Sequence, residues 1–355
     1  MSFDPRDVVT PPIIAPPFAA PAADAPDPGD VLSSQRSTSA ASPARTTSSL
    51  RALTYNILVG GGPRLQAIEQ VIRDSRADVV GLQEIVRPDL FIKLAERLEM
   101  HHTLARSRSG WHVAVLSRWP FVEERPHGGA QMARALLETL VETPTGARLR
   151  IFVTHLRAEF SSARAGETHR LREINYVLER MSVARAAREP HLLMGDFNSL
   201  APGERLEATT VLRHALVADA HQRQHGQPPF GHPSVSYILP PAARPFRPML
   251  VAATRFGPLA ALCNALAGAY MPRDVVRRMR AAGYADCYAT SHPDPRTRLF
   301  TCPLPTPAGR IDYVFASPAL AARLIACEVL TDTPTRPVSH ASDHRPVLAE
   351  FALHG

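Results

Sequence analysis

Lysine is almost absent from this chain of 355 residues. Lys93 is the only one, so arginines make up the other 39 of the 40 basic residues, which outnumber the 33 acidic residues by seven. A preference for arginine this strong is typical of a biased genomic base composition, and it does not require selection for phosphate binding. The net charge of +7 is therefore compatible with a phosphate-bearing partner but does not identify one.

Cysteine is also scarce, and no two cysteines form a C-x-x-C pair. The N-terminal sequence MSFDPRDVVTPP lacks the basic start and apolar run of an export signal, so we expect a cytoplasmic protein. In that setting neither a disulfide framework nor a structural zinc site is expected. We predict free, buried thiols at Cys263, Cys287, Cys302 and Cys327.

Long apolar runs are missing as well, and none approaches the roughly 20 residues that a membrane-spanning helix needs. Hydrophobic residues still make up 45% of the chain and charged residues 21%, which is the balance of a globular protein with a sizeable core. Residues 1–50 differ, because they hold nine prolines and no apolar periodicity. We expect a disordered tail over 1–50 and one folded domain over 51–355.

Apolar periodicity in the folded part predicts both strands and helices. Several expected strands follow one another through short turns while others alternate with helices, which favours a layered α/β protein with mixed sheets. Helices are expected over 64–76, 88–99 and 167–183, and strands near 51–58, 78–83, 112–118, 133–142, 148–155, 190–195, 310–316, 322–330 and 345–352. The helix over 167–183 has an apolar face (Leu171, Ile174, Val177, Leu178, Met181) and a charged face (Arg170, Arg172, Glu173, Glu179, Arg180).

Residues 221–270 fit this pattern poorly. We interpret them as an insertion in which a loop rich in Pro, His, Gln and Arg precedes an apolar helix over 256–270 with Asn264 at its middle. Such a helix is too short to span a bilayer. It is expected to act as a lid or core cap, or else to touch a membrane or select a substrate.

Polar side chains stand at the ends of several expected strands. In LLMGDFNSL, an apolar strand ends with Asp196, and Asn198 follows; on an extended backbone both side chains would point the same way. Each such position alone is explained by a turn or a solvated strand end. Six clusters together indicate a functional site, and the other five contain Asn56, Glu84, His155, Asp312, and the pair Asp343 and His344.

The residue types at these positions indicate a chemistry. Oxygen donors without cysteine suit Mg²⁺ or Mn²⁺. No serine or cysteine stands in a nucleophile setting such as G-x-S-x-G, which disfavours covalent catalysis. A hard divalent ion, several acids and two histidines suit the hydrolysis of a phosphate ester by activated water.

The segments LTYNI, GLQEI, VTHL, GDFNS, RIDYVFASP and SDHRPV occur in an order that resembles the endonuclease/exonuclease/phosphatase superfamily. The resemblance covers about 51–200 and 284–355. It implies an α/β fold, namely a four-layer α/β sandwich with two mixed β-sheets packed face to face, helices outside and the site at one rim. It also implies a metal-dependent phosphoesterase, with Mg²⁺ or Mn²⁺ as the cofactor.

The resemblance also implies roles for individual residues. Glu84 and Asp343 would bind the principal divalent ion, with Asn56 close by. Asp196 and Asn198 would position the attacking water and a phosphate oxygen.

For the remaining motifs, the resemblance implies that Asp312 orients His344 and that His155 touches the scissile phosphate. Arg134 stands where some members place a phosphate-binding arginine. Either His344 or Asp196 acts as the base, and the sequence leaves both open.

Departures from particular subfamilies narrow the substrate. Apurinic-site enzymes usually carry an acidic residue where this chain has Leu58, and inositol 5-phosphatases tend to have a Tyr–Arg pair where it has Ser199 and Leu200. We therefore expect a phosphodiesterase or nuclease that acts on a phosphate ester, with nucleic acid among the candidate substrates, and a monomer by default. The alternatives are a phosphatase or sphingomyelinase-like esterase on a small or lipid head-group phosphate, and a binding protein on an inactive scaffold.

Overall fold

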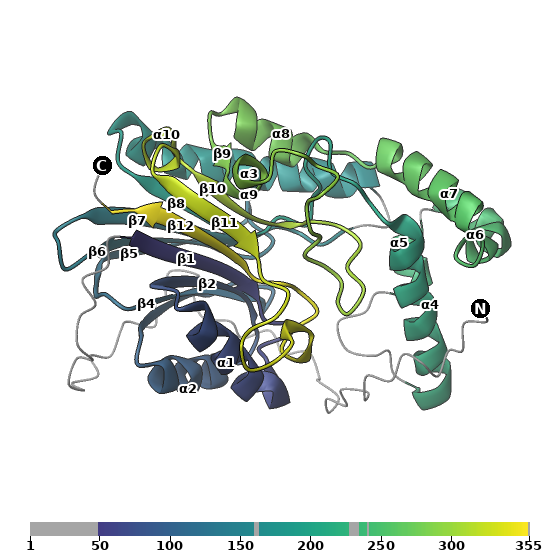
Figure 1. Ribbon diagram of the computed structural model, residues 1–355, viewed down its shortest axis with the longest axis horizontal. Helices are drawn as coiled ribbons and strands as arrows, with labels where there is room; N and C mark the ends of the chain where they lie inside the picture. The colour runs from purple at the N-terminus through teal and green to yellow at the C-terminus, as the bar shows by residue number, and fades with distance from the viewer. Residues whose placement is uncertain (1–48, 160–162, 227–233, 240, 354–355) are drawn as a thin grey trace.

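Two six-stranded β-sheets lie face to face in the computed structural model, which describes residues 49–159, 163–226, 234–239 and 241–353 (Figure 1). The first sheet has the order β11 (Leu324–Val329), β12 (Val347–Ala352), β1 (Ser49–Asn56), β2 (Val79–Ile85), β4 (His112–Ser117), β3 (His101–Ala105). The second has the order β5 (Phe121–His127), β6 (Leu136–Glu142), β7 (Arg148–His155), β8 (His191–Asp196), β10 (Asp312–Ala316), β9 (Ala285–Asp286). Both sheets are mixed, because β1–β2 and β7–β8 pair in parallel and other neighbours pair antiparallel.

Helices cover the outer face of each sheet, which completes four layers (Figure 1). Alternation along the strands explains this arrangement: in β7, Ile151 and Val153 pack between the sheets, whereas Phe152 packs outward under helices. The first sheet is covered by α1 (Leu65–Ser75) and α2 (Pro88–Leu98), and the second by α3 (Ala163–Ala186) and α8 (Asp274–Ala281). The expected four-layer α/β sandwich is confirmed.

All nine expected strands and all three expected helices are present, but three strands were missed. They are β3, β5 and β9, each at or next to a sheet edge. The short remaining helices are η2 (Gly62–Arg64), α9 (Cys287–Ser291), α10 (Pro318–Ala321) and η4 (Val338–His340).

The insertion is more helical than expected. We predicted a long loop over 221–249, of which 227–233 and 240 lie outside the described residues. The other residues of this range lie largely in α4 (Ala208–His225), α5 (Val235–Ile238), η3 (Pro241–Phe246) and α6 (Arg247–Ala253). The apolar helix is present as α7 (Gly257–Tyr270). These helices pack on one another beside the sandwich (Figure 1), with Leu212, Ala215 and Val235 in a small core of their own.

Two further predictions concern the cysteines and the tail. All four cysteines are free, but only Cys287 and Cys327 are buried, whereas Cys263 and Cys302 are half-buried. Nearly all of the expected tail, residues 1–48, lies outside the described residues, and β1 already begins at Ser49. None of the helices in the described part of the chain has the length and apolar composition that crossing a membrane requires.

Candidate active site

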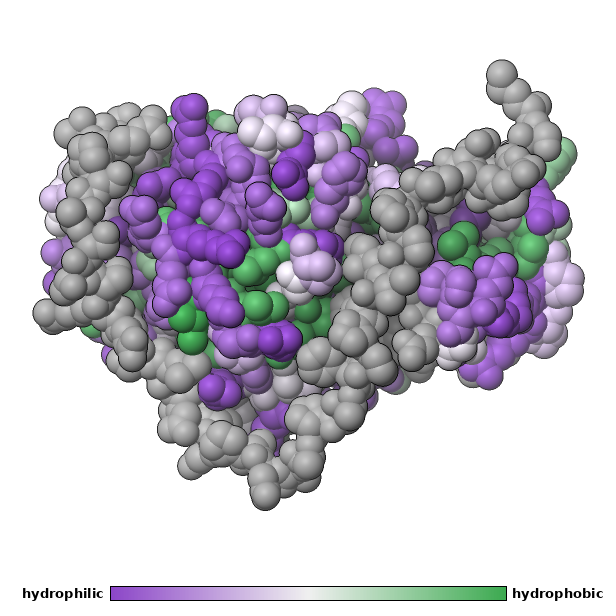
Figure 2. Space-filling model, turned by 90° about the horizontal axis from the view of Figure 1, so that it is seen from below, coloured by the Kyte–Doolittle hydropathy of each residue, from purple (hydrophilic) through white to green (hydrophobic). Residues whose placement is uncertain are grey.

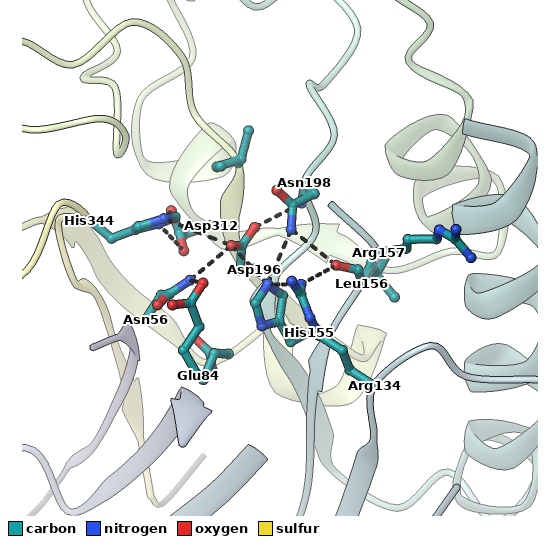
Figure 3. Close-up of polar contacts among 12 residues, drawn as sticks. Asn56, Glu84, Arg134, His155, Leu156, Arg157, Asp196, Asn198, Asp312 and His344 are labelled. Carbon is teal, nitrogen blue, oxygen red and sulfur yellow. Dashed lines mark hydrogen bonds and ion pairs between the residues drawn. The ribbon is translucent and has the colours of Figure 1, made fainter. Parts of the chain in front are cut away.

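The strand-end residues meet at one rim of the sandwich, where the register of the second sheet sets three of them side by side. On β8, Asp196 is opposite His155 of the parallel strand β7 and opposite Asp312 of the antiparallel strand β10. The first sheet contributes Asn56 from the end of β1 and Glu84 from β2. The site therefore lies where the two sheets come together (Figure 3).

Asp196 stands at the centre of this cluster. Its Oδ2 accepts a hydrogen bond from Asn56 Nδ2 at 3.1 Å and lies 3.3 Å from His155 Nε2, while its Oδ1 accepts from the backbone N–H of Asn198 at 2.8 Å. Burial alone would raise the pKa of this carboxyl. The two nearby histidines, His155 and His344, together with the Asn198 N–H, instead hold the pKa of Asp196 well below its usual range, so it is a carboxylate at neutral pH.

A glycine immediately before Asp196 allows the strands to approach closely. Gly195 has a φ of +153°, and a Cβ at this position would stand 1.9 Å from the carbonyl oxygen of Thr154 on β7. Any side chain here would push β7 and β8 apart next to the pair of His155 and Asp196.

Asn198 reaches the site through a turn, which corrects the expectation of an extended backbone. Its φ is +47°, in the left-handed region that asparagine tolerates, and the Asp196 carboxylate stabilises that turn. The Asn198 amide then donates to Leu156 O at 3.0 Å and lies 3.2 Å from His155 Nε2. The Asn198 side chain lies beside Asp196 in the same cluster (Figure 3).

His155 is buried and is joined by Arg134. The guanidinium contacts His155 Nε2, donates to Leu156 O at 2.9 Å and lies over the Trp111 ring at 5.6 Å. Burial and the positive charge of Arg134 lower the pKa of His155, against the opposing effect of Asp196. The His155 ring therefore lies between a cation and a carboxylate that shift its pKa in opposite directions.

His344 and Asp312 form a carboxylate–imidazole pair. His344 Nδ1 lies 2.9 Å and 3.1 Å from the two carboxylate oxygens of Asp312, which leaves Nε2 facing Asp196 Oδ2 at 3.9 Å. Burial would lower the pKa of His344, but Asp312, Cys302 and Asp343 raise it well above the usual value. The ring is therefore an imidazolium that Asp312 holds in one orientation.

Glu84 and Asp343 are the two half-buried carboxylates of the site. A register shift between Gln83 and Ile85, with a φ of +65° at Glu84, turns this side chain toward the site. Its oxygens accept from Asn56 Nδ2 at 3.1 Å and from the Val59 N–H at 2.9 Å. The pKa of Asp343 is raised to about 6, first by burial and then by the charge of Glu84, with His344 acting in the opposite direction.

Two groups in the described chain bring potential metal ligands within 4.8 Å of one another. One is Asp196, Asp312 and His344, and the other is Cys302, Asp343 and His344. The charge of Glu84 also raises the pKa of Asp343, an effect that a bound cation would oppose. Glu84, which we predicted as a ligand together with Asp343, belongs to neither group, and the second group includes a thiol. The carboxylate oxygens of Asp196, Asp312 and Asp343 are donors of the kind that a hard divalent ion prefers.

Sequence reasoning missed the residues that support the site from α3. Glu173 and Arg170, expected on the charged outer face of this helix, are buried. The Glu173 carboxylate accepts from the N–H groups of Ala133 at 2.8 Å and Arg157 at 2.9 Å, so it fixes the segments next to Arg134 and His155. Helical periodicity gave no signal of this, because these two residues interact with loops and not with the apolar core.

The sequence model of the Endonuclease/Exonuclease/phosphatase family matches residues 53–344. A comparison with curated proteins found no match.

Three solved structures illustrate the similarity in fold. An AP endonuclease from Archaeoglobus fulgidus is 15% identical with a TM-score of 0.54, over 85% of this chain and 99% of that one. A 3′ phosphatase from Neisseria bound to a product DNA hairpin is 18% identical with a TM-score of 0.54, over the same shares. The human Nocturnin catalytic domain with bound sulfate is 14% identical with a TM-score of 0.52, over 86% of this chain and 94% of that one. At these identities the likeness concerns the fold alone.

Proposed function

Because the chain belongs to the endonuclease/exonuclease/phosphatase family, we propose that it hydrolyses phosphodiesters with water as the nucleophile in the presence of Mg²⁺ or Mn²⁺. Members of this family are phosphoester hydrolases. One observation carries the proposal: the ionised Asp196 stands within one cluster with Asn56, His155, Asn198 and the imidazolium of His344. A water molecule and a phosphate group need such a mixture of one acceptor and several donors.

Enzymes of this family generally use divalent metal ions. Glu84 and Asp343 would hold the ion, because both are half-buried carboxylates of the site and the charge of Glu84 raises the pKa of Asp343. Asn56 would position Glu84 through its amide. When bound, a divalent ion supplies positive charge that polarises the phosphate and stabilises the charge that develops on it.

Asp196 is proposed as the base. Its carboxylate accepts a hydrogen bond from the attacking water and takes the proton as the water oxygen bonds to phosphorus. The ester P–O bond on the opposite side breaks, and the leaving oxygen takes up a proton from solvent. His344, held by Asp312 at 2.9 Å, stabilises the negative charge of the phosphoryl group with its Nε2–H.

The neighbouring donors are proposed to bind the nonbridging phosphate oxygens. Arg134 presents a cation beside His155, and Asn198 presents its side-chain amide from the other side of the imidazole. A guanidinium and an amide bind anionic oxygens through charge-assisted or neutral hydrogen bonds. We assign His155, Asn198 and Arg134 to phosphate binding on this basis.

The proposed substrate is a phosphodiester, with polynucleotides as the first class to test. The Neisseria structure, in which a 3′ phosphatase holds product DNA, supports testing DNA because the fold is shared. A second candidate function is an esterase acting on a lipid head-group phosphate. The apolar residues that α7 exposes favour this second candidate, since a polynucleotide offers nothing to cover them.

A substrate panel tests the proposal. With Mg²⁺ or Mn²⁺, the panel comprises single- and double-stranded DNA, RNA, bis-p-nitrophenyl phosphate, a phosphomonoester, inositol phosphates and sphingomyelin, and the Asp196→Asn variant serves as the blank. Cleavage of polynucleotides or of the diester by the wild type alone supports the proposal. Activity confined to monoesters or to the lipid favours the esterase, and no turnover with bound metal contradicts both.

A further inference from the structure

The helix α7 is oriented with its polar side inward. Its Asn264 accepts a hydrogen bond from the Thr209 N–H at 2.9 Å and donates to Glu207, so this amide is tied to the start of α4. The apolar Leu262, Leu266 and Tyr270, spaced four residues apart, are instead 55%, 62% and 57% exposed. A helix facing only water would present the opposite pattern.

Other large apolar side chains continue this surface. Phe246 at the end of η3 is 57% exposed, Met249 in α6 is 50% exposed, and Phe256 after α6 is 61% exposed. The helix α6 packs against α7. In Figure 2 apolar residues reach the surface at the right-hand end, where these helices lie. We call the six residues the α6–α7 face, namely Phe246, Met249, Phe256, Leu262, Leu266 and Tyr270. Among the described residues they make up six of the eleven exposed large hydrophobics.

The chain segment that forms the α6–α7 face carries positive charge and no acidic residue of its own. From Ala220 to Arg273 the sequence contains no aspartate or glutamate, while it contains five arginines at 223, 244, 247, 255 and 273. Arg244 and Arg255 are exposed on this segment. Arg247 is exposed as well, but its guanidinium lies 3.4 Å from the Asp219 carboxylate of α4. Exposed apolar side chains interspersed with arginines complement a surface that has an anionic outer layer over an apolar interior.

We propose that the α6–α7 face docks on an anionic lipid bilayer. The apolar residues would enter the boundary between head groups and acyl chains, and the arginines would lie among lipid phosphates. A second copy of the chain is a poorer occupant, because a two-fold contact would bring two arginine-rich faces together. The helix lies on the bilayer, since 14 residues are too few to cross it.

The segments that flank the insertion, including α4 and the chain after α7, bond to loops next to the candidate active site. Ala308 O accepts from the Glu207 N–H at 2.8 Å, His214 Nε2 lies 3.0 Å from Thr306 O, and Arg273 donates to Ala201 O. Ala201 lies in the segment that follows Asp196 and Asn198. Docking through α7 would thus bring the site to phosphodiesters displayed at a bilayer surface, a substrate class that rests on the proposed function.

Vesicle co-sedimentation tests the docking with the full chain. The wild type is mixed with vesicles of phosphatidylglycerol and phosphatidylcholine, or of phosphatidylcholine alone, and compared with the double variant Leu262→Glu/Leu266→Glu. The control is Val122→Glu/Val183→Glu, which adds the same two charges at valines of β5 and α3 that are 47% and 74% exposed. We expect the double variant to lower the partition coefficient on anionic vesicles at least tenfold, because burying a single leucine side chain in the bilayer raises that coefficient by about this factor.

The expected result has two further parts: the control binds like the wild type, and vesicles without phosphatidylglycerol bind less protein. Wild-type protein that stays in solution, or binding that the double variant retains, would overturn the proposal. A dimer that the double variant dissociates, without vesicle binding, would also overturn it and assign the face to a second copy.

Hydrolysis of soluble bis-p-nitrophenyl phosphate separates this proposal from the function on which its substrate class rests. We expect the double variant to keep the wild-type rate on the soluble diester and to lose at least tenfold on a phosphodiester lipid in the anionic vesicles. Vesicle binding without any hydrolysis would refute the proposed function and leave docking standing. Hydrolysis of the soluble diester without vesicle binding would do the reverse.

Discussion

Replacing Gly195 by alanine tests whether the close approach of β7 and β8 builds the site. The added methyl carries two costs. A φ of +153° is unfavourable for an L residue by about 1–3 kcal/mol. In addition, the methyl would stand 1.9 Å from Thr154 O and 2.9 Å from Thr154 C, which forces the strands apart and costs a further 1–3 kcal/mol or so. We expect Gly195→Ala to lower the free energy of unfolding by about 2–6 kcal/mol.

Gly146→Ala is the matched control, because Gly146 has a φ of +80° but nothing within 4 Å of an added Cβ. Gly146→Ala therefore has the cost of a positive φ without a steric clash. The added methyl restricts the unfolded chain equally in both variants, so this effect cancels in the comparison. Urea unfolding of the wild type and both variants gives the difference, which we expect to be about 1–3 kcal/mol. Equal loss of stability in the two variants would refute the argument from strand approach.

The remaining predictions concern the polar groups of the site. His344→Ala should lower turnover by about 10²-fold, since the phosphoryl charge loses its imidazolium, whereas the exposed His340→Ala should not; equal rates in both variants would refute the role. Glu84→Gln and Asp343→Asn should each weaken Mn²⁺ binding at least about tenfold, as measured by calorimetry, because losing even a residue that only supports a metal ligand has an effect of this size. Unchanged binding would place the ion elsewhere. Arg134→Gln should lower kcat/KM for a phosphodiester about ten- to a hundredfold through the lost charge-assisted hydrogen bond, so a wild-type value would exclude phosphate binding by this residue.

The sequence predicted elements with strong periodicity and missed those with a weak signal. The strand β5 was missed because its residues are mostly half-exposed and include Pro126, so neither an apolar run nor clean alternation marks it. β3 is a five-residue edge strand and β9 has two residues, which is too short for a pattern. α4 was missed because its apolar positions pack on the insertion's small core and not on the sandwich.

Convergence of the site could be predicted because its residues stand at strand ends, and strand ends meet at sheet rims. What the sequence could not predict is how the side chains are held. The bulge that turns Glu84 inward and the left-handed turn at Asn198 depend on pairing between strands. The support that Glu173 gives to Ala133 and Arg157 joins segments 40 and 16 residues apart, and no local spacing reports such contacts.

The rate of bis-p-nitrophenyl phosphate hydrolysis by Asp196→Asn tests the central claim most directly. The control is Asp89→Asn, which removes a carboxylate that is 52% exposed and paired with Arg87 on the surface. With Mn²⁺ present, we predict a rate about 10²–10⁴-fold below wild type for Asp196→Asn, the usual contribution of a general base, and an unchanged rate for the control. A rate near wild type in Asp196→Asn, with the fold intact, would contradict the account of this site.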